Sequence, residues 1–282
     1  MSHEDHHHHH HHLPADASSL NRAFRLGIAL NLLFVIVEFV AGLLLAMLAF
    51  RLAQSPATPR YTYGYKKSTV LISLLNSLIL LIAVGVIVAE SIGRMLHPET
   101  VTGDAIAWTA GVGVVVNGFT AWLFMRDKGR DLNVRGAYLH MAADALVSVG
   151  VLLSGVVISW TGWTLIDPIV GLAVAAVIVG SVWSLLRDSL RLSLDGVPGG
   201  IRIEEVARSM EAVEGVRGVH HIHVWAISTT ENALTAHVVL DELGRMEEVK
   251  HRLKELLREE GIRHATLEFE TAQEHCREPH DL

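Results

Sequence analysis

The sequence predicts an α-helical membrane domain followed by a small α+β domain in the cytoplasm. Half of the 282 residues are hydrophobic, and the mean hydropathy of +0.36 is higher than that of ordinary soluble chains. The apolar residues lie in long blocks up to Arg191, and beyond it polar and apolar residues alternate as in a compact soluble domain. The formal net charge of -7 lies mostly in the later part, so nucleic acid is not an expected partner.

Residues 1–20 form a His-rich tail with seven consecutive histidines, from His6 to His12. Such a run binds zinc or nickel without any fold. It is either a purification tag or a native tail, and the rest of the interpretation is the same in both cases. The first apolar block is too long for the hydrophobic region of a cleaved secretory signal.

The membrane domain is expected over residues 21–192. A spanning helix needs about 20 mostly apolar residues, and five blocks meet this requirement: residues 26–50, 68–93, 105–125, 136–160 and 166–186. The loops 51–67 and 126–135 are rich in lysine and arginine, which places them in the cytoplasm. The other two loops are nearly free of basic residues and are expected outside. This scheme puts the C-terminal domain in the cytoplasm of a multi-pass protein in the lipid bilayer.

The first block does not fit this topology. Arg22 and Arg25 precede it and Arg51 follows it, so both ends are predicted to be cytoplasmic. Two passes need on the order of 40 residues, so a block of this length cannot cross twice. Either the N-terminus is forced outside, or the block is the remnant of a hairpin.

Two ionisable residues lie inside the fourth block, in the stretch GAYLHMAADALVSVGVLL. An aspartate at the centre of a spanning helix costs roughly 2.5 to 3.5 kcal/mol on insertion scales. His140 and Asp144 are four residues apart and therefore share one helix face. An imidazole and a carboxylate suit zinc or a similar divalent metal, and both must be deprotonated to bind it. The alternative is a hydrogen bond that packs helices.

The Pro/Gly-rich segment 193–200 is expected to be a linker. Residues 201–273 then read as helix 203–214, strands 219–228 and 233–241, helix 245–260 and strand 263–270. In the last strand Ala265, Leu267 and Phe269 are predicted to share one face. The order αββαβ indicates a ferredoxin-like sheet with its helices on one side.

Several histidines of this domain are candidate metal ligands. In a regular strand, His221 and His223 would lie together on the face opposite His220. The tail 274–282 carries His275, Cys276 and His280, which form either a soft-metal cluster or a disordered segment.

The stretches YLHMAADALVSVGVLL, YTYGYKKSTVLISLLNSLILL and VHHIHVW, with LTAHVVL and HATLEFE, together resemble the cation diffusion facilitator family, in its zinc, cadmium and cobalt efflux branch. The resemblance implies a six-span homodimeric antiporter, expected in a bacterial inner membrane, that exports divalent metal in exchange for protons. His140 and Asp144 match one half of the family's tetrahedral transport site. The resemblance also implies regulatory zinc at positions matching His220, His237 and His251, with an acidic ligand near Glu270.

The other half of the family's transport site is missing. NLLFVIVEFVAGLL (residues 31–44) resembles the first family span, and LAMLAFRLAQ (residues 45–54) resembles the end of the second. The segment that would carry the second ligand pair is absent between them, which leaves five spans here. Glu38 could replace a ligand, but we favour a protonated or hydrogen-bonded carboxyl. Asn31, Asn76 and Asn117 are interpreted as interhelical hydrogen-bonding residues.

Two functions therefore remain open. The first is divalent metal efflux by proton antiport, with zinc as the first cargo and cadmium or cobalt as further ones, and with transport expected to be impaired by the missing second-span ligands. The second is a membrane-anchored metal-binding or regulatory subunit that has lost transport. An intramembrane metalloenzyme is a distant third, because the spans lack three ligands with a general base.

Overall fold

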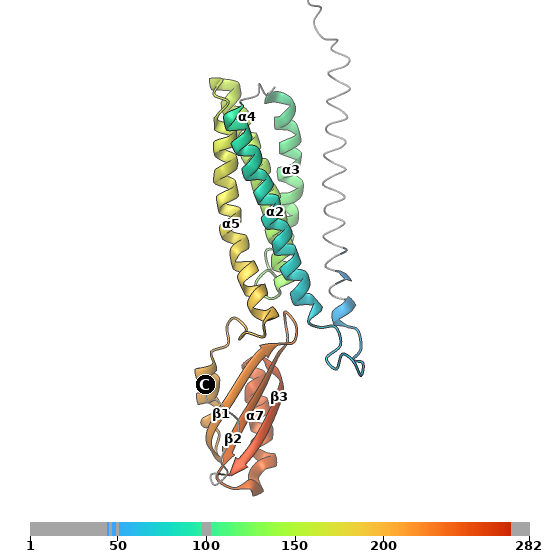
Figure 1. The fold of residues 1–282 in the computed structure, drawn as a ribbon, viewed down its shortest axis with the longest axis vertical. Coiled ribbons are helices and arrows are strands. Elements are labelled where there is room, and N and C mark those ends of the chain that lie inside the picture. The colour runs from blue at the N-terminus through green and yellow to red at the C-terminus, as the bar shows by residue number, and fades with distance from the viewer. Residues whose placement is uncertain (1–43, 45–46, 49–50, 98–102, 272–282) are drawn as a thin grey trace, which may run out of the picture.

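The computed structural model describes residues 44, 47–48, 51–97 and 103–271. In Figure 1, long helices stand side by side on top of a small domain of strands and helices. The His-rich tail, nearly all of the first expected span with Glu38, and the tail with His275 and Cys276 lie outside the described residues. The count of five spans therefore stays a prediction.

Four helices of the membrane domain are described, and they coincide with the second to fifth expected blocks. They are α2 (Ser68–Leu96), α3 (Gly103–Phe124), α4 (Leu132–Thr161) and α5 (Ile166–Ser193). Among the described residues, α2, α4 and α5 are long and apolar enough to cross a membrane, and α3 contributes the shorter apolar stretch Gly113–Phe124. The starts of α2 and α4 lie at the same end as the C-terminal domain (Figure 1), as the positive charges of the loops predict.

The helices bury one stripe against each other and expose apolar side chains on the outside. Leu80, Ala143 and Ile178 come from α2, α4 and α5 and lie in one buried cluster. Phe119, Trp122 and Trp183 are large, apolar and more than half exposed, which suits contact with lipid. At the outer end, Arg94 donates to Asp167 at 2.8 Å and ties α2 to α5.

The ends of α4 are fixed by local chemistry. The Asp131 side chain accepts from the backbone N–H groups of Asn133 and Val134, at 2.6 and 3.2 Å, and so caps the N-terminus of α4. Gly162 ends the helix with φ of 69°, a left-handed conformation that glycine adopts without a steric penalty. The helix that carries His140 and Asp144 is therefore anchored at its cytoplasmic end by one aspartate.

The cytoplasmic domain has the expected order αββαβ, with an additional 3-10 turn. Its elements are α6 (Ile203–Glu211), β1 (Val216–Ala226), β2 (Asn232–Leu240), η1 (Leu243–Arg245), α7 (Met246–Glu259) and β3 (Ile262–Thr271). The sheet order is β1-β2-β3, with β1 and β2 antiparallel and β2 and β3 parallel. Because α7 connects the two parallel strands, it lies across one face of the sheet.

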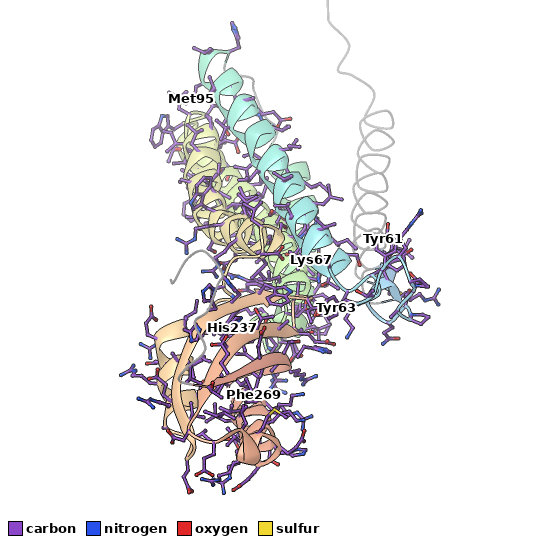
Figure 2. All side chains as sticks on the ribbon, turned by 60° about the horizontal axis from the view of Figure 1, so that its bottom comes forward. Tyr61, Tyr63, Lys67, Met95, His237 and Phe269 are labelled. Carbon is purple, nitrogen blue, oxygen red and sulfur yellow. The ribbon has the colours of Figure 1, made fainter. Side chains whose placement is uncertain are left out.

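The two faces of this sheet differ in character. Met210 of α6, Leu253 and Leu257 of α7, and Leu234 and Val238 of β2 form the buried core on the helical face. Ala265, Leu267 and Phe269 pack against this core, as predicted from their alternation. His237 follows Ala236 and precedes Val238 on β2, so it lies on the opposite face, which no described helix of the domain covers (Figure 2).

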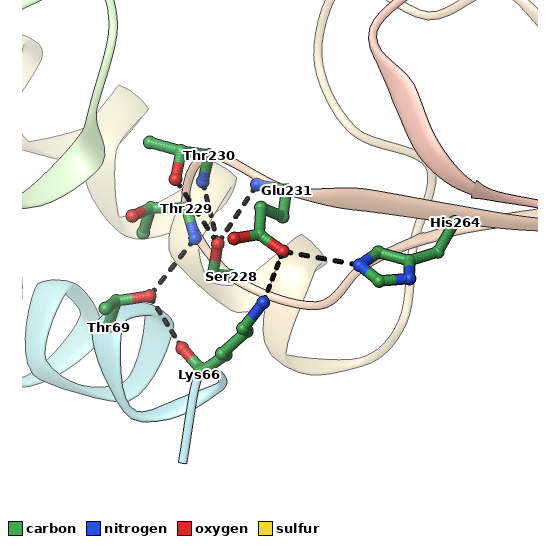
Figure 3. Close-up of polar contacts among 7 residues, drawn as sticks. All are labelled: Lys66, Thr69, Ser228, Thr229, Thr230, Glu231 and His264. Atoms are coloured by element: carbon green, nitrogen blue, oxygen red, sulfur yellow. Dashed lines mark hydrogen bonds and ion pairs between the residues drawn. The ribbon is translucent and has the colours of Figure 1, made fainter. Parts of the chain in front are cut away.

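Residues 228–231, the turn between β1 and β2, join the two domains (Figure 3). Lys66, just before α2, forms an ion pair with Glu231 at 2.6 Å. The Thr229 N–H donates to Thr69 Oγ1 at 3.1 Å, and its hydroxyl donates to Asp131 at 2.6 Å. The turn therefore contacts both the start of α2 and the residue that caps α4.

A second contact joins the start of α2 to the linker and to the end of β1. Lys67 Nζ lies 2.5 Å from Asp195 Oδ1 and donates to the Ala226 carbonyl at 3.0 Å. Figure 2 shows Lys67 at this junction and Met95 at the far end of α2. Strands that carry candidate metal ligands are thus tied directly to the membrane helices.

The junction is expected to weaken at acid pH. The hydrogen bond from Lys66 is the largest cause that holds the pKa of Glu231 below its ordinary 4.5, with a smaller contribution from His264, while burial opposes the shift. Because the folded-state pKa is the lower one, this carboxylate stabilises the docked turn above pH 4.5 and loses its effect as the pH falls through the folded-state pKa.

After replacement of Glu231 by glutamine, the thermal unfolding midpoint is therefore expected to decrease less steeply as the pH is lowered from about 5 to about 3. The measurement is a pH series of unfolding midpoints of the full chain in detergent, with Glu255→Gln, an exposed site on α7, as the matched control. An unchanged acid slope in Glu231→Gln would contradict this role of the ion pair.

Candidate metal centres

The first candidate centre lies within α4. His140 Nε2 is 3.6 Å from Asp144 Oδ2, and the side chains are 18% and 28% exposed. At 1.5 Å per residue, Asp144 lies about 18 Å along the helix from Leu132, well inside the membrane. The helical repeat and the apolar surroundings thus place an imidazole and a carboxylate together at membrane depth, as predicted.

The helix α3 approaches α4 closely along the same stripe. Ser148 follows Asp144 by one turn, and a Cβ atom on Gly113 of α3 would lie 2.6 Å from the Ser148 hydroxyl. The two helices run in opposite directions, so Asn117, one turn further along α3, reaches the level of Asp144. Asn117 is only 6% exposed. The sequence predicted that Asn117 forms hydrogen bonds between helices. Its position at the level of Asp144 was not predicted and follows from the structure.

Two ligands are too few for a four-coordinate zinc. Among the described residues, no group of three potential side-chain ligands within 4.8 Å of one another lies in the transmembrane helices. His140 and Asp144 can hold a divalent ion weakly, with water or further groups completing its shell. Because both lose a proton to bind metal, ion and protons compete for the same atoms.

The second candidate centre lies on the open face of the cytoplasmic sheet and unites one residue from each strand. The ligand atoms of His220, His237 and Glu270 all lie within 4.8 Å of one another. His220 is paired directly with His237 across β1 and β2. The His237 Nδ1–H group donates to Glu270 Oε1 at 2.5 Å, and Glu270 Oε2 is 3.4 Å from His220 Nε2.

The chemistry of this donor set fits a divalent metal such as zinc. Two imidazoles and a carboxylate are common zinc ligands, and the proton between His237 and Glu270 is one that a bound metal would displace. Glu270 is buried, so its charge is compensated by the neighbouring imidazoles or by an ion. Six ligands were predicted in the cytoplasmic domain and the tail, and the structure brings these three together. Of the others, His275 and Cys276 lie outside the described residues.

The expected arrangement of the first-strand histidines was wrong. The register pairs His220 with His237 and His223 with Thr235, so β1 carries one residue more than β2 between these pairs. This bulge puts His220 and His223 on the same face and makes His221 part of the extra segment, with φ of 50°. Strict alternation fails because the inserted residue shifts every side chain that follows it by one position.

One predicted ligand of the described residues, His251, lies elsewhere, and two further residues near the sheet were not predicted as ligands. His251 is exposed on α7, on the helical side of the sheet, so it does not join His220 and His237 within one chain. Glu268 is 70% exposed, with its carboxylate 3.7 Å from His237 Nε2. His264 lies 3.5 Å from Glu231 at the domain junction, away from the metal cluster. A junction role for His264 carried no signal in the sequence.

Comparisons with known proteins match both domains. The profile of the cation efflux transmembrane domain matches residues 37–192, and that of the cation efflux protein cytoplasmic domain matches residues 198–271. The zinc transporter ZitB of Escherichia coli is 32% identical over 96% of this chain and 93% of the relative. That alignment runs over 297 positions, more than the 282 residues of this chain, so the relative contains residues that this chain lacks.

Two further relatives are similar over most of their length. The cadmium, cobalt and zinc/H(+)-K(+) antiporter of Bacillus subtilis is 33% identical over 82% of this chain and 76% of the relative. The metal cation efflux system protein CzcD of Cupriavidus metallidurans is 30% identical over 89% of this chain and 87% of the relative.

A solved structure of the metal-bound C-terminal domain of the CzcD transporter is 35% identical and covers 25% of this chain and 99% of its own, with a TM-score of 0.24. The two family profiles and the relatives together confirm the resemblance drawn from the sequence motifs, including a transporter rather than an enzyme. The protein is therefore a member of the cation efflux family, the family also called cation diffusion facilitators, with a multi-pass membrane domain and a cytoplasmic domain.

Proposed function

We propose that the chain exports zinc from the cytoplasm in exchange for protons, and that it accepts cadmium and cobalt as further cargo. The observation that carries this proposal is the placement of His140 and Asp144, 3.6 Å apart inside a membrane-spanning helix. Names of the relatives, among them a zinc transporter and a cadmium, cobalt and zinc antiporter, support the choice of ions.

The exchange follows from the chemistry of the two side chains. On the cytoplasmic side, neutral His140 and ionised Asp144 accept the ion, and their protons leave to the cytoplasm. On the outer side, the ion departs and the same atoms take up protons. These protons are carried inward when the site faces the cytoplasm again. Because metal and protons occupy the site in turn, a proton gradient drives the metal outward. Asn117, at the level of Asp144, can orient the carboxylate by an amide hydrogen bond.

The second candidate function is that of a regulatory or metal-buffering subunit without transport. It is favoured by the sequence, in which the segment that would carry the family's second ligand pair is missing. The longer alignment with the Escherichia coli relative supports the interpretation that a segment is missing from this chain, and sequence motifs locate that segment near residue 44. The two functions predict the same fold and differ in whether zinc crosses the membrane through the protein.

For the cytoplasmic domain we propose a resident zinc ion held by His220, His237 and Glu270, and a homodimer as the working form. The compact donor set on the open face of the sheet supports the metal site. His251 is on the opposite side, so a role in metal binding requires a metal on a second copy of the chain. Bound zinc would then change how the domains associate, and the contacts of residues 228–231 would carry that change to α2 and α4.

Zinc flux into proteoliposomes decides between the two functions. The full chain is reconstituted with an internal zinc-sensitive dye and an external pH indicator, under an inside-acid gradient. We expect saturable zinc uptake with simultaneous proton release, both lost when a protonophore collapses the gradient. Flux equal to that of empty vesicles, from folded protein whose cytoplasmic site of His220, His237 and Glu270 still binds zinc, would refute transport and favour the regulatory alternative.

A further inference from the structure

We propose that His221 is a fourth ligand that closes the cytoplasmic site around a tetrahedral zinc ion. This inference rests on the proposed zinc site of His220, His237 and Glu270. Three protein ligands leave one position of a tetrahedral zinc open, as in catalytic centres, whereas structural zinc sites have four. A fourth donor beside these three ligands would close the site.

The backbone at His221 has an uncommon conformation. Its φ of 50° lies in the left-handed region, which residues other than glycine rarely adopt. The residue belongs to the bulge between the pairs His220 with His237 and His223 with Thr235. Bulges redirect side chains beside functional sites, and a disfavoured backbone conformation persists where the surroundings impose it. Here the bulge keeps His221 beside the cluster instead of on the opposite face.

The three imidazole rings form a nearly regular triangle. The ring centroids are 5.6 Å apart for His220 and His221, and 5.2 Å apart for the pairs of His237 with His220 and with His221. With a Zn–N distance of about 2.05 Å, a ring centroid lies about 3.2 Å from the ion, so two rings at the tetrahedral angle lie about 5.2 Å apart. The triangle has the size that three imidazoles on one zinc ion require.

In the present ring orientation the His221 nitrogens are not grouped with the ligand atoms of His220, His237 and Glu270, so the ligand role requires a rotation of the ring. A half-turn about the Cβ–Cγ bond exchanges the nitrogen and carbon positions of an imidazole and leaves the ring in place. His221 is 7% exposed, so its ring is held within the cluster, whereas His223 is exposed and its ring lies 6.3 Å from that of His221. The structure thus selects His221, and not His223, as the additional ligand.

A closed site of three imidazoles and one carboxylate has a clear chemical consequence. It leaves no position for substrate or water, so it suits a resident ion that shapes the domain and not an ion in transit. The donor set fits zinc or cobalt in tetrahedral geometry. Metal binding would also tie the bulge of β1 to β2 and β3 through one ion.

The variant His221→Gly tests this ligand role. Glycine tolerates the positive φ, so the metal-free protein is expected to keep or raise its unfolding midpoint. Residues that only hydrogen-bond to a metal ligand contribute ~10- to 100-fold to metal affinity, and a direct ligand contributes at least as much. The zinc affinity of the cytoplasmic site is therefore expected to fall by at least this range. All variants are measured in the full chain carrying His140→Ala, so that the membrane site does not contribute, and the N-terminal histidines contribute equally to each.

Cobalt(II) spectra supply a second readout and a safeguard. Four-coordinate tetrahedral cobalt absorbs visible light much more strongly than five- or six-coordinate cobalt, so His221→Gly and His221→Asn are both expected to lose intensity. Asparagine tolerates the left-handed conformation and serves if the glycine variant folds poorly. The control His223→Ala removes a neighbouring exposed histidine and is expected to retain the spectrum.

Zinc affinity and cobalt intensity that are unchanged in both His221 variants would overturn the fourth-ligand role. If His237→Ala nevertheless abolishes the zinc binding that exceeds the contribution of the N-terminal histidines, the site exists with three protein ligands and only this inference fails. If His237→Ala also leaves binding unchanged, the proposed cytoplasmic site itself is wrong.

Discussion

Replacing His140 by alanine is expected to reduce zinc flux through the reconstituted protein by at least ~100-fold. Loss of a partner that merely orients a ligand costs about 10- to 100-fold in metal affinity or activity, and His140 is one of two direct ligands of the proposed transport site. The measurement is the initial rate of zinc uptake under a proton gradient at equal protein density.

The matched control for His140 is His97→Ala. His97 is an exposed histidine at the outer end of α2, far along the bundle from His140, and its loss is expected to leave flux unchanged. Asp144→Asn keeps an oxygen at the site but removes the charge and the titration, so zinc flux should fall strongly and lose its dependence on the proton gradient. Zinc uptake by His140→Ala at the rate of the parent chain would show that ions cross elsewhere.

Replacing His237 by alanine is expected to remove the stabilisation that zinc gives to the cytoplasmic domain. An ion at 100 times its dissociation constant stabilises a folded protein by about 2.7 kcal/mol. If the variant weakens binding ~100-fold, the same zinc concentration stabilises it by only about 0.4 kcal/mol. The measurement is the shift of the unfolding midpoint on adding zinc, in chains that carry His140→Ala.

Two further variants, one of a second ligand and one as a control, test the same prediction. Glu270→Gln preserves the size of the side chain and removes the anionic ligand, so it is expected to lose most of the zinc-dependent shift. His264→Ala removes a histidine of the same sheet that lies at the domain junction, and it should retain the full shift. An unaltered zinc response in both His237→Ala and Glu270→Gln would contradict the proposed cytoplasmic site.

The sequence determined the features that depend on local periodicity. About 20 apolar residues are sufficient to span a membrane, so the blocks that became α2 to α5 could be predicted from hydropathy. The pairing of His140 with Asp144 follows from the helical repeat, and the faces of β3 follow from alternation. Basic residues in the loops 51–67 and 126–135 predicted correctly which ends of the helices meet the cytoplasmic domain.

Only the tertiary structure decided how distant segments meet. The bulge at His221 depends on the register between β1 and β2, which single-strand alternation does not encode, and it reversed the predicted face of His223. Sheet formation brought Glu270 to His237, and it left His251 on the other side of the sheet. Lys66 and Glu231 are 165 residues apart in the chain and form an ion pair because two domains dock. Local patterns specify which side chains an element presents, whereas the partner of each side chain is set by the packing of whole elements.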